Sequence, residues 1–277
     1  MAELGPVPGN PLFWIDFDEA RGHVETLVEL AHDDPDERPP CVILVGQSGM
    51  GKTSILREAQ RRINVDFPEP YDWEDARYTP MLRTVIPSSS TSLKINLTLL
   101  WKLGWPITTN VHRIADLKVI DLLRKQKTRL VAIDNVHAIL TASGKARRDS
   151  LDAFRFLMSE GNVPMVIAGL GIAADIFSED PELRSRSIVL RLDPWPEGEA
   201  SQRLILDLAR GMKLRDPERL AEPEIAAFLW QKSNGVTGNF KRLLHLALKI
   251  ARRENRERVE FEDLRAAAAL LPFDPNA

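Results

Sequence analysis

The residues best suited to chemistry lie in one glycine-rich segment, Gly46–Thr53, which reads GQSGMGKT and fits the pattern G-x-x-x-x-G-K-[ST]. An apolar run, 41–45, precedes the segment, and a helix-like stretch follows it. Glycines let backbone N–H groups turn toward phosphate oxygens, and the N-terminus of the next helix adds the positive end of its dipole. The pattern therefore predicts a phosphate-binding loop, and the alternative is a glycine-rich turn with a surface lysine.

The positions within this loop have expected roles toward a nucleoside triphosphate. Lys52 would reach the β- and γ-phosphates, and Thr53 would ligate Mg²⁺. We therefore predict that the chain binds ATP and Mg²⁺ as cofactors, through Gly46, Gln47, Ser48, Gly49, Met50, Gly51, Lys52, Thr53 and Ser54.

A second part of the expected site is an apolar strand that ends on an acid. The four apolar residues 130–133 precede Asp134, which is the pattern of a Walker B strand. The carboxylate of Asp134 would hold Mg²⁺ through water, on the side opposite Thr53. Many strands end in Asp, so this pattern indicates a Walker B strand only in combination with the phosphate-binding loop upstream.

The residue after Asp134 bears on hydrolysis. ATPases of this architecture usually place Glu there to polarise the attacking water, whereas this chain has Asn135. An amide has no basicity at neutral pH, although it can still orient a water molecule. Another residue, such as His137, is the alternative source of that function. We expect nucleotide binding to persist and hydrolysis to be slow or absent.

Strands and helices must alternate to bring these positions together. Strand-like runs occur at 41–45, 81–86, 129–134, 164–169 and 187–192, with helical periodicity between them. This order predicts an α/β fold, a parallel sheet flanked by helices, with the loop and Asp134 at the carboxyl ends of the strands. Beyond residue 197 the pattern is only helical. The expected divisions are a flexible N-terminus (1–12), a nucleotide-binding α/β domain (13–195) and a helical lid subdomain (196–277).

Composition narrows the class of protein without identifying it. Hydrophobic residues make up 44% of the 277 residues and charged residues 28%, as in ordinary globular proteins. The net charge of −3 means that any contact with nucleic acid must come from a local basic patch. The single cysteine, Cys41, excludes a disulfide framework and suits a core position. No signal peptide or bilayer-spanning run is visible, so we expect a cytoplasmic protein with no membrane partner.

Four further segments follow the loop in order, DNVH at 134–137, PMVIAG at 164–169, DPELRSR at 180–186 and LDPW at 192–195. Together with the loop they resemble the TniB/TnsC-like family of AAA+ transposition regulators, and the similarity runs from about Phe13 to Leu248. The resemblance implies a P-loop AAA+ sheet with a C-terminal all-helical lid. It also implies an ATP-dependent DNA-binding protein that forms a homo-oligomer, a ring or helical filament, on duplex DNA. Such proteins recruit a DDE transposase, often through a target-selection partner.

The resemblance carries roles onto particular residues of this chain. Arg186 matches the arginine finger that reaches the γ-phosphate of a neighbouring subunit, so the catalytic positions implied are Asp134, Asn135 and Arg186. A surface arginine in a basic cluster is the alternative for Arg186. Lys241 or Arg242 matches the sensor 2 position of the lid and could touch phosphate, although cations are common on helix surfaces. The polar sensor 1 residue of the family is replaced by Leu170, which weakens hydrolysis further.

Contacts to DNA are expected between the second strand and Asp134, a region that faces the filament bore in related proteins. The candidates are Lys94, Thr109, Arg113 and Lys118, with hydroxyl groups at 88–92 and Thr108 able to donate to phosphate. Because no base-reading motif is visible, we expect salt-dependent contacts to the DNA backbone with little sequence preference. The alternative is a solvated helix face.

Two other functions remain open at this point. The chain could be a helicase-loader-like ATPase that turns over ATP on DNA, which Asn135 disfavours. It could also be a nucleotide-gated signalling switch without DNA contact, which the near-neutral charge permits.

Overall fold

The computed structural model of the protein describes residues 17–271 except for 34–38, 72–76, 88–90 and 137–143. Within these residues the chain divides into two compact units, an α/β unit over Asp18–Asp193 and a helical unit that begins at Pro194 and includes Phe17. Each unit has its own buried apolar cluster. The nucleotide-binding loop predicted from the sequence lies in the α/β unit.

The α/β unit is built on one parallel sheet of five strands, in the order β2-β3-β4-β1-β5. The pairings β1–β4, β1–β5, β2–β3 and β3–β4 are all parallel, which confirms the predicted sheet. The strands are β1 (Cys41–Gly46), β2 (Met81–Val85), β3 (Leu130–Asp134), β4 (Met165–Gly169) and β5 (Ser187–Leu192).

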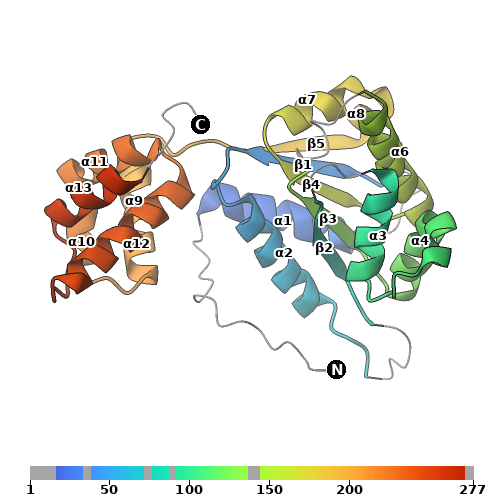
Figure 1. The fold of residues 1–277 in the computed structure, drawn as a ribbon, viewed down its shortest axis with the longest axis horizontal. Helices are drawn as coiled ribbons and strands as arrows, with labels where there is room; N and C mark the ends of the chain where they lie inside the picture. The colour runs from blue at the N-terminus through green and yellow to red at the C-terminus, as the bar shows by residue number, and fades with distance from the viewer. Residues whose placement is uncertain (1–16, 34–38, 72–76, 88–90, 137–143, 272–277) are drawn as a thin grey trace. The chain divides into compact units, whose positions relative to one another are not determined.

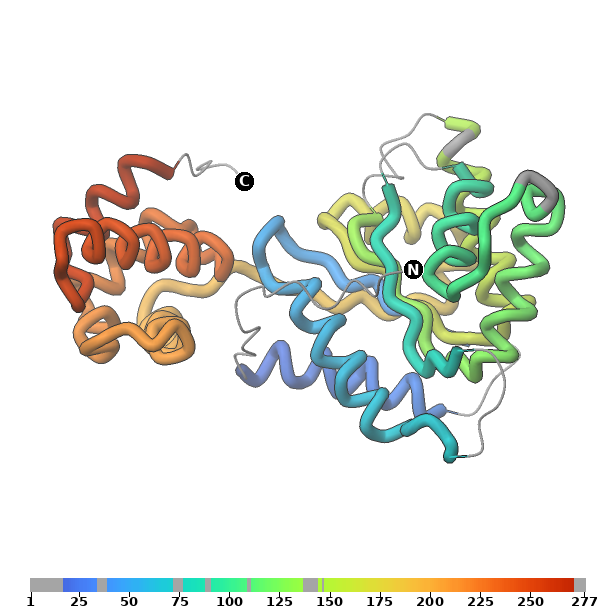
Figure 2. The backbone as a smooth tube through the Cα atoms, turned by 60° about the horizontal axis from the view of Figure 1, so that its bottom comes forward, coloured from blue at the N-terminus to red at the C-terminus, as the bar shows by residue number. Residues whose placement is uncertain are grey.

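Helices flank this sheet on both faces, because parallel strands require crossover connections (Figures 1 and 2). α1 and α2 pack together on one face, and α3, α4 and α6 pack together on the other. The described helices of this unit are α1 (Asp18–His32), α2 (Lys52–Asp66), α3 (Ser92–Lys102), the 3₁₀ helix η1 (Thr109–Arg113), α4 (Ala115–Lys125), α6 (Gly144–Gly161), α7 (Ile172–Glu179) and α8 (Pro181–Arg186).

Covering both faces buries the central strands along their whole length. Every residue of β3 and β4 is buried, as are Cys41–Val45 of β1, which explains their continuous apolar sequences. Burial raises the pKa of the Cys41 thiol to about 12, so this side chain is a neutral part of the core, as expected from the sequence.

The helical unit consists of short helices around a second apolar core (Figure 1). Trp195 anchors its start, since its Nε1 donates to Thr237 Oγ1 at 2.9 Å and its carbonyl accepts from Trp230 Nε1 at 2.7 Å. The described helices are α9 (Glu199–Gly211), α10 (Pro217–Leu220), α11 (Pro223–Ser233), α12 (Thr237–Arg253) and α13 (Phe261–Leu270). The expected all-helical C-terminal part is therefore present. None of the helices described in either unit is long and apolar enough to cross a membrane.

Candidate functional site

The glycine-rich loop joins the end of β1 to the start of α2, at the carboxyl end of the sheet. Gly49 and Gly51 have φ angles of 86° and 102°, in the left-handed region that favours glycine. No side chain among the described residues caps the N-terminus of α2, and its first turn carries no acid. The first N–H groups of the helix, together with its positive dipole end, therefore remain suited to an anion.

Lys52 points back into this loop. Its Nζ donates to the carbonyl oxygens of Gly46 at 2.6 Å and Gln47 at 2.8 Å. Burial lowers the pKa of Lys52 from its ordinary value, and the Asp134 carboxylate partly offsets that effect. The loop thus holds a cation between backbone dipoles, where it can exchange carbonyl oxygens for phosphate oxygens.

Thr53 and Asp134, predicted as the two magnesium ligands, lie in direct contact. Thr53 Oγ1 donates to Asp134 Oδ2 at 2.6 Å, and the backbone N–H of Asn135 donates to Asp134 Oδ1 at 2.8 Å. Asp134 is only 6% exposed. A hydroxyl and a carboxylate are oxygen donors of the kind that Mg²⁺ prefers, so these two side chains fit such an ion.

A pocket of about 390 Å³ opens beside these groups. Asn135 lies on its wall with φ of 66°, a left-handed backbone conformation that Asn tolerates better than most residues. Leu170 brings an apolar side chain to the place expected for a polar sensor. The lining residues are Ser48, Gly49, Gly51, Lys52, Thr53, Ser54, Asp134, Asn135, Gly169 and Leu170.

Arg186 is bound within its own subunit at the end of α8. Its Nη2 donates to Glu182 Oε1 at 2.8 Å and its Nη1 to Ser159 Oγ at 3.4 Å, leaving the side chain 15% exposed. It is not among the residues that line the pocket. Arg184, on the same helix, is exposed and makes no ion pair within the described residues. A role for Arg186 in a neighbouring site stays a prediction.

Lys241 and Arg242 lie in α12 of the helical unit, while the loop lies in the α/β unit. Their proposed contact with phosphate also stays a prediction. His137 and residues 88–90 lie outside the described residues.

The four residues predicted to contact DNA differ in their exposure and in the contacts that they make within the chain. Lys94 on α3 and Arg113 at the end of η1 are exposed. Lys118 is committed within the chain, because its Nζ pairs with Asp121 at 2.7 Å and lies 4.0 Å from the centroid of the Trp105 ring. Thr109 lies in η1, and its side chain is not part of what the structure describes.

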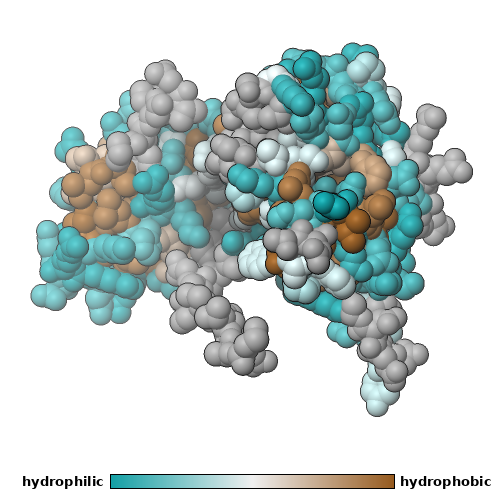
Figure 3. All heavy atoms as spheres, turned by 45° about the vertical axis from the view of Figure 1, so that its right-hand side comes forward, coloured by the Kyte–Doolittle hydropathy of each residue, from teal (hydrophilic) through white to brown (hydrophobic). Residues whose placement is uncertain are grey.

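Apolar side chains share this part of the surface. Trp101 is 64% exposed, Leu117 62% and Ile114 50%. Figure 3 shows apolar surface among hydrophilic surface on the side of the α/β unit that carries α3 and α4. Over the residues that the structure describes here, the region is therefore mixed in character and does not form a continuous basic patch.

Arg83 is a charged residue near the site that the sequence did not single out. It lies in the middle of β2, and its Nε donates to Gln60 Oε1 at 3.3 Å. Burial lowers the pKa of Arg83, Arg57 adds to this effect and Asp134 opposes it. The sequence indicates this residue by placing an arginine in the middle of a predicted strand. Burying a charged side chain there costs free energy unless a partner lies near it.

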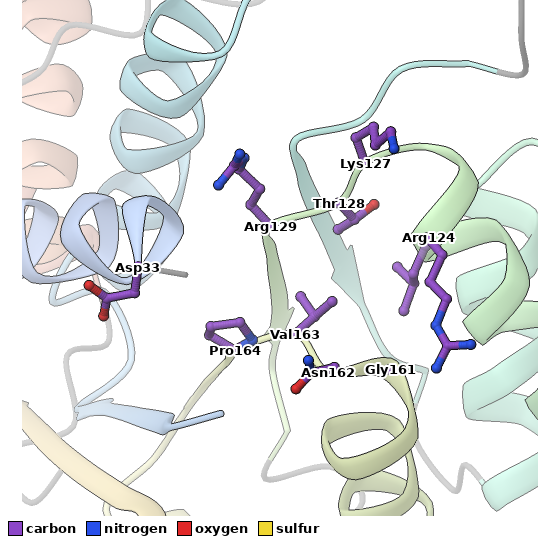
Figure 4. Close-up of a pocket in the computed structure, with 10 residues that line it drawn as sticks. Asp33, Arg124, Lys127, Thr128, Arg129, Gly161, Asn162, Val163 and Pro164 are labelled. Atoms are coloured by element: carbon purple, nitrogen blue, oxygen red, sulfur yellow. The ribbon is translucent and has the colours of Figure 1, made fainter. Parts of the chain in front are cut away.

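A second pocket, of about 350 Å³, lies at the opposite ends of the same strands (Figure 4). Arg124 donates to the carbonyl of Glu160 at 2.6 Å, and Arg129 lies over the Phe67 ring at 4.1 Å. Thr128 Oγ1 and Asn162 Oδ1 are buried polar atoms without a hydrogen-bond partner among the described residues. The lining residues are Asp33, Leu123, Arg124, Lys127, Thr128, Arg129, Gly161, Asn162, Val163 and Pro164.

The chain matches the family described as bacterial TniB protein over residues 11–197. This span covers more than half of the 277 residues. No curated protein sequence matches the chain.

Solved structures resemble the chain in fold. The ORC2 protein of Aeropyrum pernix, in ADPNP–ADP complexes, has a TM-score of 0.69 at 15% identity and covers 92% of this chain and 68% of its own. The ORC1 protein of the same organism, in complex with DNA, has a TM-score of 0.68 at 18% identity, with coverages of 92% and 66%. Cdc6p from Pyrobaculum aerophilum has a TM-score of 0.65 at 15% identity, with coverages of 98% and 70%.

These identities show the fold alone, and that fold is AAA+, as predicted. The chain spans about two thirds of the length of these solved proteins.

Proposed function

The chain belongs to the bacterial TniB family, and from this premise we propose that it is an ATP-dependent, DNA-binding AAA+ regulator of transposition. In this proposal it binds ATP with Mg²⁺, oligomerises on duplex target DNA and recruits a DDE transposase, with slow or absent hydrolysis. The observation that carries the nucleotide half of the proposal is the contact of Thr53 with Asp134 beside Lys52, next to an Asn where a catalytic base would stand. The DNA and transposition half is supported by membership of the TniB family.

The nucleotide half of the proposal rests on charge and geometry. The N-terminus of α2 and the Lys52 ammonium group supply positive charge at the rim of the pocket. Thr53 and Asp134 supply the oxygen ligands for Mg²⁺, which would neutralise charge on the β- and γ-phosphates when bound. Binding a triphosphate would release the Lys52 ammonium group from the carbonyls of Gly46 and Gln47.

Slow turnover follows from two side chains of the pocket wall. Asn135 can orient a water molecule but cannot take its proton. Leu170 offers no hydrogen bond to the γ-phosphate. A protein that holds ATP without turning it over rapidly is suited to stable assembly, and this separates the proposal from a helicase-loader-like ATPase.

In an oligomer, an arginine from a neighbouring subunit would complete the nucleotide site. Arg186 must leave both Glu182 and Ser159 to reach a neighbour, although its side chain is only 15% exposed in the single subunit. A neighbour's triphosphate, with its larger negative charge, would compete effectively for this guanidinium. We therefore propose that Arg186 exchanges partners when subunits associate on DNA.

The test is an electrophoretic mobility shift on duplex DNA with ATP, with ADP and without nucleotide, with phosphate release followed in the same mixtures. The proposal expects a slow-migrating complex that requires ATP, and phosphate release well below one per minute per subunit, on the order of the slowest P-loop proteins. Brisk release would favour the loader alternative. Absence of any complex would favour a nucleotide-gated switch that does not bind DNA.

A further inference from the structure

The longest helix of the helical unit, α12, carries a one-sided row of basic residues. Its 17 residues include no Asp or Glu. At about 100° per residue, its basic side chains fall within an arc of about 120°. These residues form the α12 basic face, which consists of Lys241, Arg242, His245, Lys249, Arg252 and Arg253.

The opposite side of α12 holds the helix in the core. Phe240, Leu243, Leu244, Ala247, Leu248 and Ala251 are buried there. This packing fixes which way the helix faces, so the basic residues cannot turn inward. Arg242, Lys249, Arg252 and Arg253 are exposed.

The α12 basic face differs from many of the other basic positions of the helical unit. Lys249, Arg252 and Arg253 make no ion pair within the part of the chain that the structure describes. Five arginines elsewhere in the unit are paired with a carboxylate, in the pairs Arg210–Glu218, Arg215–Glu257, Arg219–Glu260, Arg256–Asp263 and Arg258–Glu260. Arg203 and Arg265 make no ion pair among the described residues, but neither has an unpaired basic neighbour on its own helix. Basic side chains therefore gather on one face of α12, which has no acid of its own, while many of the arginines around it lie in ion pairs.

Stabilisation of the helix itself explains only part of this pattern. Arg252 and Arg253 lie in the last turn, where cations interact favourably with the helix dipole. That effect falls off within one turn and disfavours cations toward the N-terminus. It therefore gives no reason for Lys241, Arg242 or Lys249, and the predicted sensor 2 role would account for only one of the first two.

We propose that the α12 basic face binds the phosphate backbone of duplex DNA. From Lys241 to Arg253 the row extends for about 18 Å at about 1.5 Å per residue, against one phosphate charge per about 1.7 Å of duplex axis. Lysine and arginine side chains on a rigid helix suit several adjacent phosphates and read no sequence. This inference rests on the proposed function. It adds a second DNA-binding surface, on α12, to the contacts predicted for residues 94–118.

The test is duplex binding measured by fluorescence anisotropy over a series of salt concentrations in ATP. The variant is Lys249→Gln/Arg252→Gln/Arg253→Gln, which keeps good helix formers at all three positions. The slope of log K against log salt is negative, and each lost phosphate contact reduces its magnitude by about 0.9. The slope of the variant should therefore be shallower than that of wild type by about 2 to 3. The affinity should drop at least roughly tenfold at 0.1 M salt.

Two control variants separate this effect from net charge and from folding. Arg215→Gln/Arg219→Gln/Arg258→Gln removes the same charge from ion-paired positions in the same unit and should leave the slope within about 0.9 of wild type. Lys249→Arg/Arg252→Lys/Arg253→Lys keeps the charge and should bind as wild type does.

The outcomes distinguish this inference from the proposed function. If wild type binds DNA in ATP and the triple Gln variant keeps its slope and affinity, the α12 inference is overturned and the proposed function stands. The face would then be assigned to an acidic protein partner. If wild type binds no duplex at any salt concentration, the proposed function fails, and the α12 inference fails with it.

Discussion

β3 and β4 carry a pocket at each of their ends, and the two pockets have opposite surroundings. At the carboxyl ends, Asp134 and Gly169 meet the N-terminus of α2. At the amino ends, the residues before β3 and β4 meet the last residues of α4 and α6. A helix presents N–H groups at its start and carbonyl groups at its end, so one pocket suits an anion and the other does not.

The cations of the two pockets differ accordingly. Lys52 lies among loop carbonyls that a phosphate can replace. Arg124 donates to the carbonyl of Glu160 near the end of α6, where it balances the negative end of that helix. Basic residues beside a pocket therefore do not by themselves mark a phosphate site. The backbone around them decides what they can bind.

The largest expected effect at the carboxyl-end pocket is that of Lys52→Ala. Loss of charge-assisted contacts to phosphate should cost about 2 to 3 kcal/mol, which is roughly a 30- to 150-fold loss of ATP affinity. Isothermal titration calorimetry with ATP and Mg²⁺ measures this directly. Unchanged affinity in this variant would mean that the loop does not hold the triphosphate.

Asn135→Glu should restore a catalytic base at the same pocket. Phosphate release by the DNA-bound protein should rise by roughly tenfold or more, because a positioned general base contributes about 10²-fold or more when fully effective. The left-handed backbone at this position would cost the variant about 1 kcal/mol of stability. Asn135→Gln is the matched control, since it adds the same length without basicity, and it should leave phosphate release unchanged. Equal release in wild type and Asn135→Glu would show that Asn135 is not what limits turnover.

Gly46→Ala tests how closely the carboxyl end of β1 packs against β5. A Cβ there would lie 2.8 Å from the Leu192 carbonyl oxygen of the neighbouring strand. We expect a loss of about 1 to 3 kcal/mol in the free energy of unfolding, measured by urea denaturation. The control is Gly22→Ala in α1, where an added Cβ meets nothing within 4 Å and should stabilise the helix by up to about 1 kcal/mol. Equal stability of Gly46→Ala and wild type would contradict this packing.

The smallest effect on nucleotide binding is expected at the amino-end pocket. Arg124→Gln removes the hydrogen bond to Glu160 and should lower stability by about 1 kcal/mol. ATP affinity should stay within about twofold of wild type, because this arginine lies at the other end of the strands. A larger loss of ATP affinity would break the distinction between the two pockets.

The sequence predicts the parts of this molecule that depend on local pattern. The loop Gly46–Thr53, the acid at Asp134 and the five strands of the sheet follow from residue spacing and apolar runs, and the structure places the first two together. These features are predictable because parallel strands bring their carboxyl ends to one edge of the sheet.

Contacts between distant side chains were not predictable in this way. The pairing of Lys118 with Trp105, and the position of Arg83 near Asp134, depend on how helices and strands pack. The basic residues of α12 are visible in the sequence, but the pairing of five other arginines of the unit with carboxylates is seen only in the structure.

The most direct measurement is negative-stain imaging of the protein on linear duplex DNA in ATP, in ADP and without nucleotide, with phosphate release followed in parallel. The account predicts DNA-bound assemblies that form only in ATP and persist while little phosphate is released. Assemblies that form equally well without nucleotide, or only while phosphate is released rapidly, would contradict it.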